Sequence, residues 1–74
     1  MRETIINAIE DVVCVRPQEH ERMIDVMLDD ADFYETVDEC EKSLDIEIDM
    51  NGMGITDFDT VGDFVDWILT FVNE

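Results

Sequence analysis

The side chains that could act as a nucleophile or a general base are few in this sequence and lie far apart. There is one histidine, His20, in a string of charged residues that is typical of a solvated loop. One serine, Ser43, and two cysteines, Cys14 and Cys40, are the obvious nucleophiles. Neither these residues nor any threonine stands at a recognisable catalytic spacing from His20. We therefore expect no catalytic residues and no enzymatic activity.

The segment 49–60, DMNGMGITDFDT, has the length of a calcium-binding loop. Counted from its first residue, a glycine falls at position six, but Met53 occupies position five and Thr60 occupies position twelve instead of a bidentate glutamate. Two ligands are thus missing, and we expect no metal site. A turn at 51–52 followed by a short helix near 55–58 is the simpler interpretation.

The densest group of carboxylates falls on a predicted amphipathic helix within residues 29–48. Its apolar stripe recurs at spacings of four, three and four residues: Phe33, Val37, Cys40 and Leu44. Acidic side chains cover much of the remaining surface: Asp32, Glu35, Asp38, Glu39 and Glu41. The helix begins among acids and has Lys42 in its last turn, as the helix dipole favours at each end. Polar and apolar residues then alternate over 45–49, which predicts an extended connector with Ile46 and Ile48 turned inward.

Three strings in this chain resemble acyl carrier proteins: V-R-P-Q-E at 15–19, L-D-I-E-I at 44–48 and T-V-G-D-F-V-D-W-I at 60–68. The resemblance covers nearly the whole chain. In that family the acidic helix begins with an Asp-Ser motif, whose serine bears a 4′-phosphopantetheine arm. Free N–H groups and the dipole at a helix N-terminus favour such a phosphodiester. The resemblance implies a domain that holds acyl groups on this arm and presents them to fatty-acid or polyketide enzymes.

The attachment position carries no hydroxyl in this chain. Asp30 matches the aspartate of the motif, and Ala31 stands where the serine is expected. An alignment without a gap, counted back from Ile48, instead puts Asp30 itself at the serine position. Ser43 lies at the far end of the helix in a K-S-L-D string, but the glycines within 52–54 would interrupt the helix that should follow. We therefore expect a chain that cannot be loaded, through an engineered Ser-to-Ala replacement or through natural loss.

The resemblance also implies partners for the acidic helix. Its five acids are expected to dock on Lys/Arg patches of acyl-transferring enzymes and of a phosphopantetheinyl transferase, which raises the association rate more than the affinity. An acyl chain would be sheltered in the core among four residues: Phe33, Val37, Ile55 and Ile68. The simpler interpretation of the acids is a solvated helix face. Only Lys42 balances them, however, and like charges three or four residues apart cost stability.

Two more helices are expected. An apolar stripe predicts a helix over 2–13, and Thr60 with Asp63 forms a variant capping box at the start of a helix over 60–72. Residues 18–28 are predicted to form a loop with a possible helical turn. Its apolar residues are expected to pin it across the bundle: Met23, Ile24, Val26, Met27 and Leu28. All 74 residues thus form a single all-α domain, a small four-helix bundle with three main helices, a short third helix and a long first loop.

The charge balance limits the kinds of partner. Four basic residues against 21 acidic ones give a formal net charge of −17. This charge excludes ordinary binding to nucleic acid and suits a basic protein, divalent cations or mimicry of nucleic acid. Two alternatives to a carrier stay open. One is an acidic binding module without an arm, and the other is a DNA mimic that inhibits a nucleic-acid enzyme.

The cysteines and the hydropathy pattern indicate the cellular compartment in which the protein is expected. Cys14 and Cys40 do not have the spacing of metal ligands, and both are expected to be buried free thiols, typical of a reducing compartment. No apolar run approaches the ~20 residues of a membrane span, and no signal peptide is visible. We expect a cytoplasmic monomer that does not bind membranes.

Overall fold

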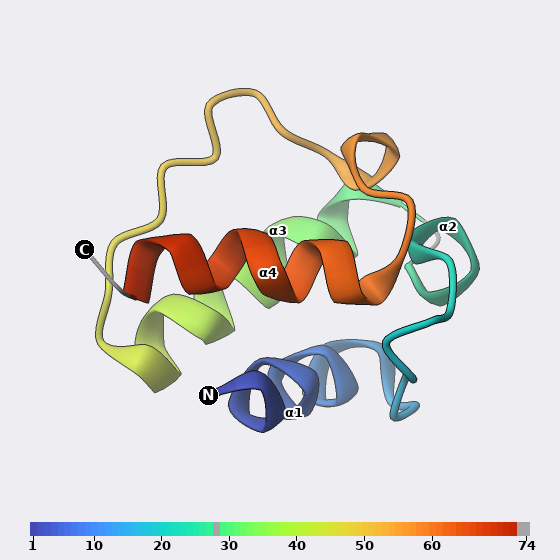
Figure 1. The fold of residues 1–74 in the computed structure, drawn as a ribbon, viewed down its shortest axis with the longest axis horizontal. Helices are drawn as coiled ribbons and strands as arrows, with labels where there is room; N and C mark the ends of the chain where they lie inside the picture. The colour runs from blue at the N-terminus through green and yellow to red at the C-terminus, as the bar shows by residue number, and fades with distance from the viewer. Residues whose placement is uncertain (28, 73–74) are drawn as a thin grey trace.

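Four α-helices and one 3-10 turn make up most of the described chain. The computed structural model describes residues 1–27 and 29–72. The elements in order are α1 (Arg2–Val13), α2 (Met23–Val26), α3 (Asp30–Leu44), the 3-10 turn η1 (Ile55–Asp57) and α4 (Val61–Val72) (Figure 1). The predicted all-α class is confirmed, and no strand occurs in the described ranges. Within these ranges no helix combines the length and the apolar character needed to cross a membrane.

The boundaries of the long helices follow from local capping groups. At the start of α3, the side chain of Asp29 accepts the N–H of Asp32 at 3.2 Å. At the start of α4, Thr60 and Asp63 exchange two hydrogen bonds of 3.2 Å, so the predicted capping box is present. α3 ends where Asp45 adopts a left-handed conformation with φ 53°. These groups satisfy backbone donors and acceptors that a helix end leaves free.

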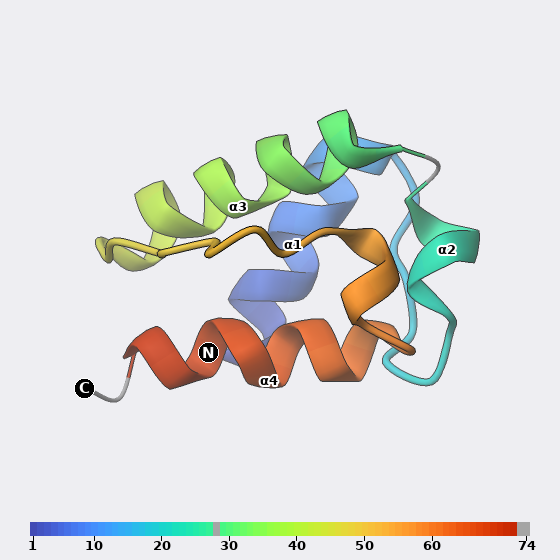
Figure 2. The ribbon, with the colours of Figure 1, turned by 90° about the horizontal axis from the view of Figure 1, so that it is seen from above.

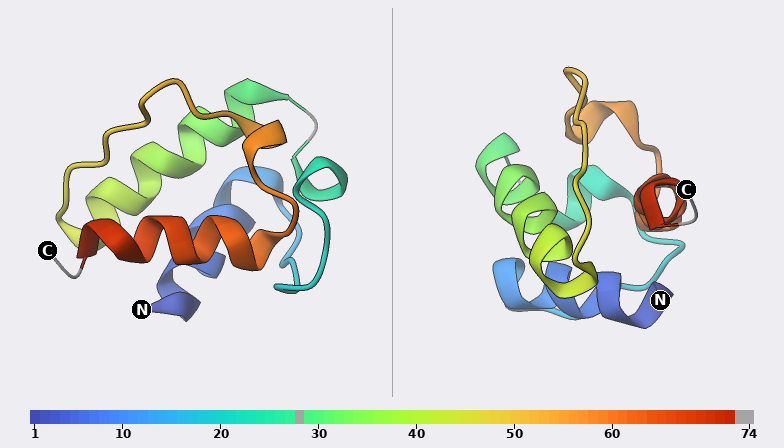
Figure 3. Two further views of the ribbon diagram at one scale, coloured as in Figure 1. Left: turned by 45° about the horizontal axis from the view of Figure 1, so that its top comes forward. Right: turned by 90° about the vertical axis from the view of Figure 1, so that its left-hand side faces the viewer.

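The long helices enclose one core. α3 and α4 run in the same direction on opposite sides of the core, and α1 crosses both (Figure 2). Seen along α4, α1 covers one side of this pair and the extended connector after α3 covers the other (Figure 3). As predicted, the connector turns its isoleucines inward: Ile48 is buried and Ile46 packs against the core. The N–H of Ile48 donates to the carboxylate of Glu41 at 2.9 Å, which ties the connector to α3.

Aromatic rings fill the centre between α3, η1 and α4. The side chain of Phe33 is fully buried, and its ring lies 5.7–6.1 Å, centroid to centroid, from those of Phe58, Phe64 and Trp67. Phe58 and Trp67 are themselves 5.3 Å apart. Such pairs stabilise a core beyond the area that they bury. Trp67 thus serves to pack the core.

The first loop is held against the start of α4 by backbone hydrogen bonds. The N–H groups of Val61 and Gly62 donate to the carbonyls of Glu21 and Glu19, both at 2.8 Å. The N–H of Met23 donates to the carbonyl of Asp59 at 3.2 Å. The bonds from Val61 and Gly62 satisfy free donors at the α4 N-terminus with main-chain oxygens of the loop. Gly62 has a close contact there, since a Cβ would lie 3.2 Å from the Glu19 carbonyl oxygen.

A salt-bridge cluster adds to this contact. Arg2, in the first turn of α1, pairs with Glu19 of the loop and, at 2.7 Å, with Asp66 of α4. The guanidinium lowers the pKa of the Glu19 carboxyl through their hydrogen bond. All three side chains are exposed, so these ion pairs add little to the free energy of unfolding. We assign them the role of orienting α1, the first loop and α4 relative to one another.

The short helices differ in part from the expectation. The turn in the first loop is the four-residue helix α2, whereas the helix expected over 55–58 is a single 3-10 turn. It ends before Phe58, whose backbone is extended with φ −121° and ψ 133°. The prediction that Ile24 pins the loop against the bundle is wrong. A single helical turn buries only one of its sides, and the side chain of Ile24 is 49% exposed. Met23 and Met27 are buried, and Leu28 lies outside the described residues.

The prediction of two buried thiols is right for Cys40 and wrong for Cys14. Cys40 lies on the inner stripe of α3, where burial raises the pKa of its thiol to about 12. Cys14 is exposed, because it follows the last residue of α1 and adopts the left-handed conformation, φ 67°, that ends the helix. Its side chain therefore leaves the stripe that the helix buries.

Candidate functional site

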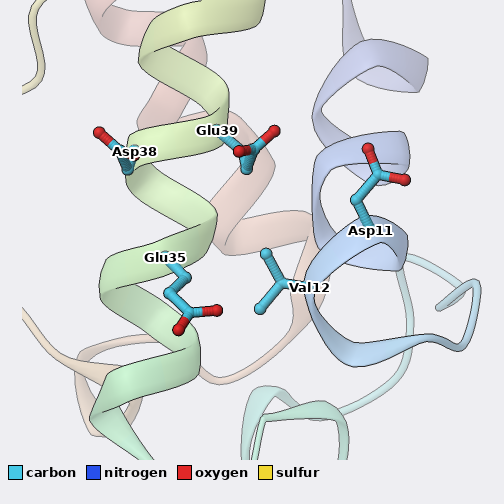
Figure 4. A pocket seen from close by; sticks show the side chains of 5 residues that line it. All are labelled: Asp11, Val12, Glu35, Asp38 and Glu39. Atoms are coloured by element: carbon cyan, nitrogen blue, oxygen red, sulfur yellow. The ribbon is translucent and has the colours of Figure 1, made fainter.

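The acidic face of α3 borders a hollow between α3 and α1. The hollow has a volume of about 330 Å³ and is lined by five residues: Asp11, Val12, Glu35, Asp38 and Glu39. Figure 4 shows Glu35 and Glu39 extending from α3 on the side of α1, while Asp38 points to the far side of α3. Val12 of α1 is half-buried and forms the apolar part of this wall.

Asp11 belongs to this site, although sequence reasoning did not single it out. It lies on an exposed position of α1, more than twenty residues before Glu35 and Glu39 of α3. The spacing within α1 shows that Asp11 faces away from the core, but it carries no information about which other helix lies next to it. Only the packing of α1 across α3 brings this carboxylate to the hollow.

The acids of α3 differ in the partners that they already have. Asp38 pairs with Lys42 at 3.0 Å, one turn further along the helix. Glu41 is half-buried and is engaged with the N–H of Ile48. Within residues 1–27 and 29–72, Glu35 and Glu39 have no ion pair. Of the five predicted docking acids, Glu35 is exposed, and Asp32 and Glu39 are both half-buried. Glu35 and Glu39 border the hollow, whereas Asp32 lies in the first turn and does not line it.

The start of α3 presents carboxylates and no hydroxyl. Asp29 is the N-cap, Asp30 is the first helical residue, and Ala31 follows with its methyl group exposed. The carboxylate of Asp29 already accepts the N–H of Asp32, so an anionic side chain occupies one of the donors that a helix start offers. The carboxylate of Asp30 lies against Gly54, where a Cβ would come within 3.2 Å of its oxygen. Ser43 is exposed at the opposite end of the helix.

A second hollow lies beside this helix start. It has a volume of about 310 Å³ and is lined by Ile24, Met27, Asp29, Asp30, Ile55 and Thr56. The exposed side chain of Ile24 thus forms part of a wall between α2, η1 and the first turn of α3.

The space proposed for an acyl chain is occupied by side chains of the protein. Phe33, Val37 and Ile68 are at most 2% exposed, and Ile55 is 6% exposed. The rings of Phe58, Phe64 and Trp67 pack against Phe33 within this region. An acyl chain could enter only if these rings moved apart, which would forfeit close-packed contacts.

The other candidate chemical groups are not brought together. His20 is exposed in the first loop, and the Cys40 thiol is buried with a raised pKa that opposes thiolate formation. In the described part of the chain, no three His, Cys, Asp or Glu side chains are placed to hold one metal ion. Within the segment 49–60, a tight turn at 50–53 precedes η1, with Asn51 and Gly52 both at positive φ and the N–H of Met53 donating to the Met50 carbonyl at 2.8 Å.

Comparisons with protein-family models, with curated proteins and with solved structures found no match for this chain.

Proposed function

We propose that this chain is an acidic docking domain of the acyl-carrier type that does not bear a prosthetic arm. It binds a basic patch of a partner protein through Glu35 and Glu39 of α3 together with Asp11 of α1. The observation that supports this most directly is that three carboxylates from two helices border one hollow without an ion pair in the described residues. Such an arrangement costs stability in the free protein and is relieved when a cationic side chain enters.

The partner is a protein with a Lys/Arg patch, of the kind that acyl-transferring enzymes and phosphopantetheinyl transferases present to carrier domains. The likeness of the strings at 15–19, 44–48 and 60–68 to carrier proteins supports this partner class. The position of the acidic helix directly after the first loop also supports the likeness to carrier proteins. The carboxylates steer the encounter and select the partner, and their contribution falls as salt screens them.

The absence of a loading site is part of the proposal. Because Asp29 caps α3, the pair at the helix start is Asp29-Asp30, which favours the alignment that puts Asp30 at the attachment position. The alternative alignment puts Ala31 there. Neither residue can form a phosphodiester with 4′-phosphopantetheine.

We predict that the protein gains no mass on incubation with coenzyme A and a phosphopantetheinyl transferase of broad specificity. Intact-mass spectrometry measures this directly. Asp30→Ser and Ala31→Ser each restore a hydroxyl in one of the two alignments, and we expect Asp30→Ser to be the variant that is modified. Ser43→Ala is the matched control and should behave like the unaltered chain. Modification of the unaltered chain at any residue would contradict this part of the proposal.

The docking surface is tested by charge reversal. We expect Glu35→Lys or Glu39→Lys to lower the association rate with a basic transferase by about fivefold at low salt, and to have little effect at high salt. Surface plasmon resonance with an immobilised phosphopantetheinyl transferase is a suitable first measurement. Glu47→Lys is the matched control, because Glu47 is exposed on the connector and has no ion pair within the described residues.

A second candidate, mimicry of DNA, is favoured by one observation. Exposed acids occur on every long element and not only on α3, for example Glu3 on α1, Glu47 on the connector and Asp66 on α4. A DNA mimic uses charges on several faces. For this function the Glu47→Lys control would weaken binding as much as Glu35→Lys, and duplex DNA would compete for the partner.

A further inference from the structure

An apolar socket lies at the C-terminal end of α1, separate from the acidic face of α3. It has a volume of about 120 Å³ and is lined by Val13, Val15, Pro17, Glu21, Asp25 and Val26. Pro17 is buried, and Val13 and Val26 are half-buried. Val15 is 68% exposed, more than any other large hydrophobic side chain in the described residues. The first loop and α2 thus leave part of an aliphatic surface uncovered, at the end of the molecule where α2 lies (Figures 1 and 3).

The rim of the socket is acidic. Glu21 is held in place because its carboxylate accepts the N–H of Gln18 at 2.8 Å. Asp25 lies in α2, is exposed, and has no ion pair within the described ranges. Two arginines adjoin lining residues in the sequence, and neither lines the socket. Arg16 pairs with Glu10 at 3.2 Å, and Arg22 lies 3.9 Å from Asp59. An apolar floor with two carboxylates at its edge suits an aliphatic group next to positive charge.

The overall charge selects among possible occupants. A second copy of this chain would bring another formal charge of −17 against the first. Nucleic acid and anionic lipid surfaces are opposed for the same reason. A positively charged protein segment is the occupant that this electrostatic field attracts.

We propose that this socket binds one aliphatic side chain of a partner protein in a segment where Lys or Arg flanks that side chain. The volume fits a single leucine-sized group, since a cavity of ~150 Å³ accommodates a benzene ring. The aliphatic side chain contacts Val13, Val15 and Val26, and the flanking cations contact Glu21 and Asp25. The inference goes beyond the docking function proposed above, because it uses none of the acids of α3 and holds for a partner that never contacts that helix.

The test uses the capped peptide KKLKK and the isotope-labelled full chain, followed by two-dimensional NMR at low salt. We expect chemical-shift changes to concentrate at Val13, Val15 and Val26. Replacing the leucine of the peptide by alanine should weaken binding about tenfold, because it removes most of the apolar area that the socket buries. The peptide EELEE should not bind. Equal affinity of the leucine and alanine peptides, or shift changes spread over all acidic faces, would show adsorption by charge alone and overturn the proposal.

Variants of the protein test the apolar floor and the acidic rim of the socket separately. Val15→Ser should weaken binding of the leucine peptide about fivefold with little effect on the alanine peptide, and its high exposure means that folding is preserved. Asp25→Lys should weaken both peptides, and more than Glu47→Lys does, because Asp25 lines the socket and Glu47 does not. Equal effects of these two reversals would refute a local acidic rim. Shifts of the same valines with protein concentration alone would assign the socket to a second copy and also overturn the inference.

Discussion

Replacing Phe33 by alanine is expected to lower the free energy of unfolding by about 3–5 kcal/mol. The Phe33 ring is 0% exposed and packs against Phe58, Phe64 and Trp67, so its removal leaves a cavity at the point where α3, η1 and α4 meet. A domain of this length has a total stability of ~4–11 kcal/mol. The substitution therefore removes a large part of it, and we expect a melting temperature lower by about 20 °C.

Urea unfolding monitored by the fluorescence of Trp67, the single tryptophan, measures this effect at the site of the change. Tyr34→Ala is the matched control. Tyr34 is the next residue on α3 and is also aromatic, but it is 53% exposed, so its loss should cost under about 1 kcal/mol. Similar losses for the two variants would show that the aromatic cluster is not the centre of the core.

Raising the sodium chloride concentration from 10 mM to 500 mM is expected to raise the melting temperature by about 10 °C. Twenty-one acidic residues oppose the compact state, and four basic ones offset little of that repulsion. Each like-charge pair three or four residues apart on a helix costs ~0.2–0.5 kcal/mol, and salt weakens several such pairs at once. Differential scanning calorimetry at fixed pH measures the shift.

Substitutions that replace a carboxylate by a neutral amide show which carboxylates contribute most to the repulsion. Glu35→Gln combined with Glu39→Gln should raise the melting temperature at low salt and reduce its salt dependence, because both carboxylates border the hollow without an ion pair in the described residues. Asp38→Asn is the matched control on the same helix. It should stabilise less, since it also removes the 3.0 Å pair with Lys42. A melting temperature that stays constant with salt would rule out charge repulsion as a main determinant of stability.

The regular elements could be predicted because their signals are local. α1 spans Arg2–Val13, and α4 begins at Val61, directly after the Thr60 N-cap of the capping box, both as the periodicity and the caps predict. The end of α3 at Leu44 coincides with the change from a helical to an alternating pattern. Each of these signals lies within one or two turns of chain, so no distant contact is needed to read it. The errors fall where one residue leaves the helical repeat, as at Cys14, or where a helix has only one turn, as at Ile24.

Local patterns along the chain are enough to predict the long helices, the apolar stripes that they bury, the excess of acid and the lack of a hydroxyl at the start of α3. Which acids share a surface depends on how the helices pack. This packing places Asp11 beside Glu35 and Glu39, turns Glu41 to the connector, and fills the expected acyl space with Phe58, Phe64 and Trp67. The physical reason is that periodicity fixes the direction of a side chain around its own helix axis. The crossing of α1 over α3, which sets the neighbours, depends on how all the buried side chains pack together.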